Sequence, residues 1–193
     1  MKINAKDEAK IKTQMTLEAL QEALELLSPY FFAEMGIYVV LGFSILGSAI
    51  GIFNTGATLV TSTVAHPEIR SKNLLSILFC EAIALYGVIM SIIILTAIKE
   101  GAERSLTRDY VTKQEVLKAG YGYGAAGLSV GFSNFAAAIT VGVLGSSVAV
   151  SHCGDSSLFV KLFISEIFAE AIALIGLISG IVMTTSVGFD SRI

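Results

Sequence analysis

Hydrophobic positions along the chain fall into four long apolar segments, at roughly 30–63, 73–98, 119–150 and 158–187. Each segment is longer than the ~20 residues that a helix needs to cross the hydrocarbon core of a bilayer. At ~1.5 Å per residue, each can also project past the lipid headgroups. Because hydrocarbon offers no water to backbone amides, and because Ala, Leu and Ile dominate these segments, the pattern predicts four transmembrane helices.

Polar stretches separate the apolar segments. "AHPEIRSKN" at 65–73 and "SHCGDSS" at 151–157 contain turn-forming residues and predict tight turns. The charged stretch 99–118 predicts a longer connector between two helical hairpins. Residues 14–27 show an amphipathic pattern, which predicts a helix that lies on a membrane, packs on a partner or is simply solvated. The predicted organisation is a polar or amphipathic segment, a first hairpin, a connector, a second hairpin and a tail, at 1–29, 30–98, 99–118, 119–187 and 188–193.

The two predicted hairpins are copies of each other. Sliding the sequence by 89 residues aligns "FCEAIALYGVI" at 79–89 with "FAEAIALIGLI" at 168–178, with eight of eleven positions identical. The same shift aligns "GFS" at 42–44 with "GFS" at 131–133, and no gap is needed. The pattern therefore indicates an all-α membrane protein made by tandem duplication of a helical hairpin. Because each repeat spans two helices, both copies have the same orientation, which favours a ring.

Small residues distinguish the first and third apolar segments from the other two. They recur every four or five positions, a spacing that lets helix backbones approach closely in lipid. The glycines concerned are Gly42, Gly47, Gly51 and Gly56 in the first segment, and Gly124, Gly127, Gly131, Gly142 and Gly145 in the third. The second and fourth segments are bulkier. We therefore expect the first and third helices to form a tight inner layer, and the other two to face lipid.

Composition agrees with a membrane protein. The chain is 54% hydrophobic and 15% charged, and its mean hydropathy is +0.75. The net charge of −3 and the lack of a basic stripe do not favour a nucleic-acid partner. Cys80 and Cys153 are not expected to form a disulfide or a metal site. The G-x-G-x-x-G match at 122–127 follows no predicted strand, so no nucleotide cofactor is expected. No catalytic motif is present either.

Glutamates inside the apolar segments are the candidate chemistry. Glu81 and Glu170 are equivalent in the repeat, and Glu166 lies one turn before Glu170. An ionised carboxylate is costly at this depth, so these side chains are expected to hold protons, and an intramembrane acid is a candidate functional site. The structural alternative is a neutral glutamate that hydrogen-bonds between helices. Duplication at one depth favours the functional interpretation for Glu81 and Glu170.

Two polar residues are possible accessories to Glu81. Reflecting the first hairpin about its turn places Asn54 at the depth of Glu81, where it could hydrogen-bond the protonated carboxyl. Tyr86 offers a nearby hydroxyl. A sodium ion would need several oxygen ligands, whereas a proton needs one carboxylate, so the sequence favours a proton.

The segments "GIYVVLGFSILGSAIGIFNTGATLV", "PEIRSKNLLSILFCEAIALYGVIM" and "SLFVKLFISEIF" resemble the proteolipid subunits of rotary V-type ATPases. The resemblance covers about residues 30–187 and is to the c-double-prime type, because the first hairpin already carries its acid, Glu81. It implies a ring that carries protons past a stator while other subunits hydrolyse ATP. The implied partners are other proteolipid subunits, an a-type stator subunit, a d-type central-stalk subunit and lipid. The implied location is the vacuole or another endomembrane.

The chain departs from the c-double-prime pattern in two places. That pattern has an additional N-terminal helix, whereas residues 1–29 are too polar to span a membrane. Glu166 matches the acid of its "EIF" motif, but Glu170 matches the c-type position, where c-double-prime has a small residue. We therefore expect two proton sites, Glu81 and Glu170, with Glu166 as a possible accessory that modulates Glu170 or is a structural acid. The alternative is that Glu170 is silent, because Glu166 lies one turn away on the same face.

The sequence leaves two orientations in the membrane, and more than one function, open. The family implies that the turns at 65–73 and 151–157 face the cytosol. Lys and Arg in the N-terminal segment and in the connector favour the opposite orientation. A stand-alone proton-coupled transporter and a non-transporting structural protein with four spans are the alternative functions.

Overall fold

The computed structural model describes residues 10, 12–20, 28, 30–107 and 113–187. Four long helices make up nearly all of this part: α2 (Phe31–Ala65), α3 (Arg70–Thr107), α4 (Lys113–Gly154) and α5 (Leu158–Ser186), with a 3₁₀ turn, η1, at Pro67–Ile69. All four are long and apolar enough to cross a membrane. The predicted all-α fold with four transmembrane helices is confirmed.

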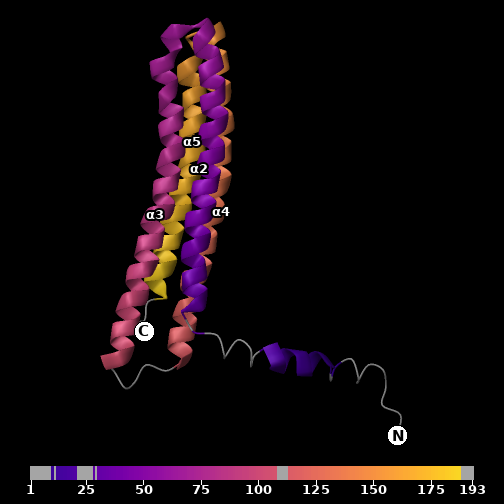
Figure 1. Ribbon diagram of the computed structural model, residues 1–193, viewed down its shortest axis with the longest axis vertical. Coiled ribbons are helices and arrows are strands. Elements are labelled where there is room, and N and C mark those ends of the chain that lie inside the picture. Colours follow the sequence, from indigo (N-terminus) through magenta and orange to yellow (C-terminus); the bar gives the residue numbers. More distant parts are fainter. Residues whose placement is uncertain (1–9, 11, 21–27, 29, 108–112, 188–193) are drawn as a thin grey trace.

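The four helices lie side by side along one axis (Figure 1). The turns from α2 to α3 and from α4 to α5 lie at one end of the bundle, and the first residues of α2 and α4 lie at the other. Consequently α2 runs parallel to α4, and α3 runs parallel to α5. This arrangement is the one that a duplicated hairpin requires.

The helices on either side of the connector are longer than the sequence predicted. α3 continues to Thr107 and α4 begins at Lys113, so both helices extend into the polar stretch 99–118 that was predicted as a connector. The residues concerned are rich in Lys, Glu, Ala, Arg and Leu, which are strong helix formers. The helices therefore continue past the point where the sequence stops being apolar.

Both predicted tight turns are confirmed. At the first, α2 ends at Ala65, and the His66 amide donates to the Ser62 carbonyl at 3.0 Å before η1 begins. At the second, the Ser157 amide donates to the Asp155 carboxylate at 2.8 Å. This hydrogen bond lowers the pKa of Asp155, because it stabilises the ionised form. The Asp155 turn thus leads directly into α5.

Glycine brings α2 and α4 into close backbone contact. A Cβ atom added at Gly36 would lie 2.9 Å from both the Gly124 Cα and the Tyr123 carbonyl oxygen. At Gly51 it would lie 2.6 Å from the Ala138 carbonyl oxygen. Real Cβ atoms do not approach backbone this closely, so glycine is required at these positions. The predicted tight packing of the first and third apolar helices is confirmed.

The outer helices complete the bundle and cover its core. α3 packs on α2, α5 packs on α4, and α3 and α5 also contact each other. Two buried clusters form the apolar core, one around Met90, Tyr123 and Val130 and the other around Ile83 and Val141. Both cysteines are free, as expected.

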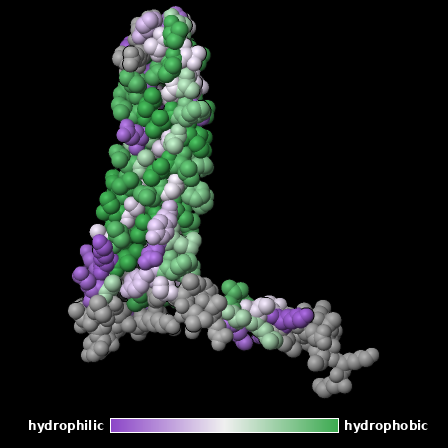
Figure 2. All heavy atoms as spheres, viewed as in Figure 1, coloured by the Kyte–Doolittle hydropathy of each residue, from purple (hydrophilic) through white to green (hydrophobic). Residues whose placement is uncertain are grey.

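Many large apolar side chains remain exposed outside this core. They include Phe53 at 74%, Phe168 at 70% and Ile175 at 67% of their possible exposure. Figure 2 shows hydrophobic residues over most of one face of the bundle, with hydrophilic residues mainly near its ends. An apolar surface of this extent is suited to lipid or to neighbouring subunits rather than to water.

Only part of the predicted N-terminal helix lies within the described residues. Residues 12–20 are helical and exposed, which agrees with the predicted helix at 14–27 as far as residue 20. Leu17 and Leu20 are more than half exposed. The remainder, 21–27, and the predicted tail at 188–193 lie outside the described residues.

The backbone contact between α2 and α4 predicts different effects of alanine at two glycines of α2. Gly36→Ala forces a methyl group against the Tyr123–Gly124 backbone and should lower the free energy of unfolding by about 1–3 kcal/mol. Gly42→Ala is the control, because no atom lies within 4 Å of its added Cβ. Denaturant titration of the purified chain in mixed micelles measures both. Equal destabilisation by the two variants would contradict the proposed packing.

Candidate functional site

Three glutamates lie away from the ends of the candidate membrane spans of the outer helices, among apolar residues: Glu81 on α3, and Glu166 and Glu170 on α5. The repeat makes Glu81 and Glu170 equivalent, but the structure gives them different surroundings. Glu81 is exposed, whereas Glu170 is only 9% exposed and Glu166 is fully buried. Duplication of the sequence therefore did not produce two equal sites.

Glu81 projects from the outer face of α3. Leu78 and Leu85, one turn before and one turn after it, are each 55% exposed, whereas its neighbour Cys80 points into the core. The nearest charged residues along the chain are Lys72 and Lys99, which lie roughly 14 and 27 Å away along the helix axis. Glu81 is thus a single carboxyl on an apolar surface, and nothing within the described bundle fixes its position by a hydrogen bond.

Glu166 is held inside the bundle by a serine of the first hairpin. The Ser76 hydroxyl donates to Glu166 Oε2 at 2.9 Å, and both residues are fully buried. Glu166 Oε1 has no hydrogen-bond partner among the residues that the structure describes. An ionised carboxylate with one bond in this apolar position would be several kcal/mol too costly, so the neutral acid is the form that fits.

Glu170 is held in a similar way by a tyrosine. The Tyr86 hydroxyl donates to Glu170 Oε1 at 3.0 Å, which links α3 of the first hairpin to α5 of the second. Tyr86 was predicted as an accessory of Glu81, but the structure directs its hydroxyl to Glu170. Glu166 and Glu170 lie one helical turn, ~5.4 Å, apart, so two acids and two hydroxyl donors share the seam between α3 and α5.

Asn54 does not hydrogen-bond Glu81 in the described part of the chain. The Asn54 side chain is half-buried on α2, and its main-chain carbonyl accepts the Thr58 hydroxyl at 2.9 Å. Its role as an accessory to Glu81 stays a prediction.

Polar residues that line the interior of α3 were not predicted from the sequence. Asn73 and Ser76 are fully buried, and Asn73 Oδ1 lies 3.4 Å from His152 Nδ1 on α4. The sequence did contain a signal for this polar interior, because positions 73, 76 and 80 are three or four residues apart and therefore share one face of the helix. Across the other helix pair, Asn134 of α4 donates to the Ser44 hydroxyl of α2 at 2.9 Å.

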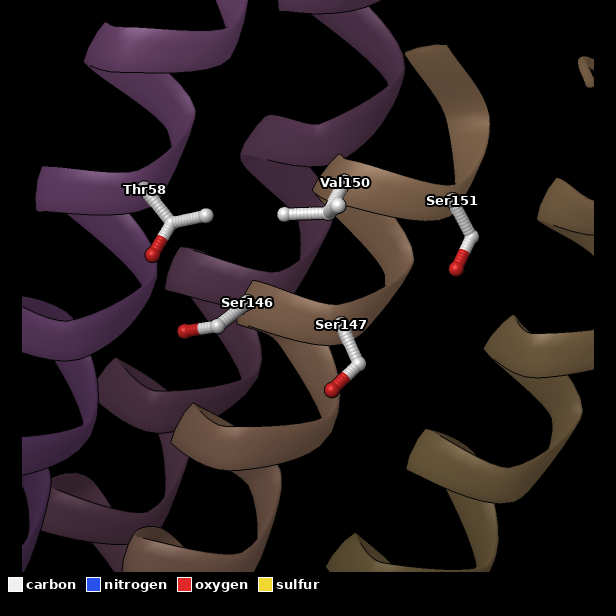
Figure 3. Close-up of a pocket in the computed structure, with 5 residues that line it drawn as sticks. All are labelled: Thr58, Ser146, Ser147, Val150 and Ser151. Carbon is white, nitrogen blue, oxygen red and sulfur yellow. The ribbon is translucent and has the colours of Figure 1, made fainter. Parts of the chain in front are cut away.

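A hollow of about 390 Å³ between α2 and α4 is a less favourable candidate site (Figure 3). Thr58 and three serines of α4 contribute hydroxyls to it. The residues that line it are Thr58, Ser146, Ser147, Val150 and Ser151. Thr58, Ser146 and Ser147 donate to carbonyls of their own helices. Within the described ranges, no three His, Cys, Asp or Glu side chains converge to hold a metal ion.

The Ser76–Glu166 hydrogen bond predicts a measurable loss of stability. Ser76→Ala leaves the buried Glu166 carboxyl without its donor and should lower the free energy of unfolding by about 1–3 kcal/mol. Ser165→Ala is the matched control, because Ser165 is the repeat equivalent of Ser76 and is exposed. Denaturant titration of both variants measures the difference. An equal or larger loss for Ser165→Ala would contradict the role of Ser76.

Comparison with known proteins reproduces the internal repeat. The family model for the C subunit of ATP synthase matches the chain twice, at residues 35–94 and 124–183. The two matches are offset by 89 residues, the same shift that aligns the two hairpins. Each match covers the apolar part of one hairpin, so the two account for all four long helices.

Curated relatives are similar over most of the chain. The c''2 subunit of the Arabidopsis thaliana V-type proton ATPase is 42% identical over 170 residues, covering 88% of this chain and 93% of the relative. The c'' subunit of the Saccharomyces cerevisiae V-type proton ATPase is 40% identical, covering 81% of this chain and 71% of the relative. The 16 kDa proteolipid, or c subunit, of the Homo sapiens V-type proton ATPase is 32% identical, covering 80% and 92%. The duplicated hairpin, its intramembrane acids and these similarities show that the chain belongs to the V-type proton ATPase proteolipid family, as a member of the c'' type.

Proposed function

We propose that Glu81 is the side chain on which this c''-type proteolipid carries protons. As a member of its family, the chain is a proton-translocating rotor subunit of the V-type ATPase membrane sector, and it is an integral membrane protein of the vacuole or another endomembrane. The observation that supports Glu81 is its position as a carboxyl exposed on the apolar outer face of α3. A carrier must reach a partner outside its own chain, and Glu81 is placed to do so.

The surroundings of Glu81 suit a carrier that alternates between two states. In its neutral form, the carboxyl can cross lipid beside Leu78 and Leu85. In its ionised form it would be stable only against a polar or cationic surface of another subunit, because a charge in hydrocarbon costs several kcal/mol. Rotation of the ring past a stator thus supplies the two environments in turn. The apolar residues beside Glu81 offer few oxygen ligands, which favours a proton over a sodium ion.

The partners follow from this cycle. The chain assembles with other proteolipid subunits in the ring, and its exposed apolar surface is available for them and for lipid. We propose an a-type stator subunit as the partner that loads and unloads Glu81, and a d-type central-stalk subunit as the contact of the two tight turns on the cytosolic side. The chain itself is non-catalytic in this proposal, and other subunits hydrolyse ATP.

Glu170 is a second proton-binding residue in this proposal. Its repeat position equals that of Glu81, and a neutral acid fits its buried position. Glu166, which lies one turn away, is likewise suited to hold a proton. The apolar parts of α3 and α5 thus combine one exposed acid, Glu81, with two buried acids, Glu166 and Glu170.

The proposed role of Glu81 predicts that Glu81→Gln abolishes ATP-driven acidification of vesicles that contain the assembled complex. Glutamine is nearly isosteric but cannot release a proton, so the ring should still assemble while transport stops. Dye quenching measures acidification, and co-purification of sister proteolipids measures assembly. Glu34→Gln is the control, because Glu34 is an exposed glutamate in the first turn of α2.

Retained acidification by the Glu81→Gln complex would show that Glu81 is not the carrier. A chain that purifies without sister subunits, as a monomer or dimer that still transports protons, would instead favour a stand-alone transporter. We expect the Glu34→Gln complex to acidify vesicles and the Glu81→Gln complex not to acidify them.

A further inference from the structure

We propose that Tyr86 is a positioning residue that keeps Glu170 inside the bundle, so that Glu170 retains its proton while Glu81 exchanges its own. This inference rests on the proposed function only in taking Glu81 as the exchanging acid. The observation that supports this proposal is a hydrogen bond between α3 and α5, in which the Tyr86 hydroxyl donates to Glu170 Oε1 at 3.0 Å. It joins the two hairpins at the one place where the repeat leads us to expect a second carrier.

The repeat itself shows why the two acids differ. Tyr86 aligns with Ile175 under the 89-residue shift, and Ile175 is an apolar side chain that is 67% exposed. The second hairpin therefore has no hydroxyl at the position that would hold Glu81. Both hydroxyl donors on the seam, Ser76 and Tyr86, come from α3, and both acceptors come from α5. The donors serve the second hairpin's acids and leave Glu81 free.

Breaking this hydrogen bond has consequences for both partners. Glu170 would have to turn away from α3 to reach the outer surface, and the half-buried Tyr86 hydroxyl would lose its acceptor. A hydrogen bond of this kind contributes about 1 kcal/mol, which corresponds to about a fivefold difference in the population of the released side chain. Glu166 adds a second restraint, because two carboxylates one turn apart in an apolar seam are not readily ionised together. Both effects keep Glu170 neutral and inside.

Labelling with a hydrophobic carbodiimide tests the position of each acid. This reagent attacks protonated carboxyls that are accessible from lipid, and peptide mapping by mass spectrometry locates the label. In the assembled complex with the unchanged chain, we expect label mainly on Glu81, little on Glu170 and none on Glu166. Tyr86→Phe should raise the labelling of Glu170 about fivefold relative to Glu81, because it removes only the hydroxyl. Tyr38→Phe, at an exposed tyrosine of α2, is the matched control and should change neither ratio.

Each outcome of the labelling experiment supports or overturns the proposed role of Tyr86. Labelling of Glu170 as fast as Glu81 in the unchanged chain would overturn the proposal, and this comparison needs no variant to fold or assemble. Unchanged Glu170 labelling in Tyr86→Phe would show that Tyr86 does not hold it. A parallel rise at Glu166 and Glu170 would indicate general loosening of the seam and would reduce Tyr86 to a structural residue. Absence of label on Glu81 counts against the proposed function, whereas the change at Glu170 still tests Tyr86.

Discussion

The close backbone contact between α2 and α4 is the constraint on which the rest of the bundle depends. In lipid, helices gain little from hiding apolar side chains, so association relies on van der Waals contact at short range. Gly36 and Gly51 allow that approach, because a Cβ at either would meet the backbone of α4. With α2 and α4 joined in this way, α3 and α5 are placed on the flanks, close enough to contact each other. The seam that holds Glu166 and Glu170 is therefore a consequence of the glycine contact between the two neighbouring helices, α2 and α4.

That seam breaks the symmetry of the repeat. α3 and α5 are equivalent helices of the duplicated hairpin, but they contribute different groups to the contact between them. α3 contributes the hydroxyls of Ser76 and Tyr86, and α5 contributes the carboxyls. A duplication thus gives rise to two chemically different acids through the tertiary contact between its copies. Glu170 of the second copy is buried in the bundle, whereas Glu81 of the first copy is exposed on its surface.

The sequence predicted the features that depend on local pattern and missed those that depend on helix rotation. Apolar length predicted four spans, and small-residue spacing predicted which two helices pack tightly. Helical spacing placed Glu166 and Glu170 on one face, but it does not say whether that face meets α3 or lipid. The partners Ser76 and Tyr86 therefore required the structure. The ends of α3 and α4 were not visible in the hydropathy pattern for another reason: apolar residues stop near Lys99, whereas the helix formers that follow continue the helix.

A carrier and a structural acid have opposite physical requirements, and the bundle separates them. A carrier must gain and lose a proton with little change in free energy, so a fixed donor that favours one state would slow every cycle. Glu81 has no such donor among the described residues. A buried acid has the reverse requirement, because an unsatisfied carboxyl in an apolar interior is costly and a hydroxyl donor reduces that cost. Ser76 and Tyr86 meet this need at Glu166 and Glu170. Exposure without a fixed partner, rather than depth in the membrane alone, is therefore what distinguishes an acid suited to transport.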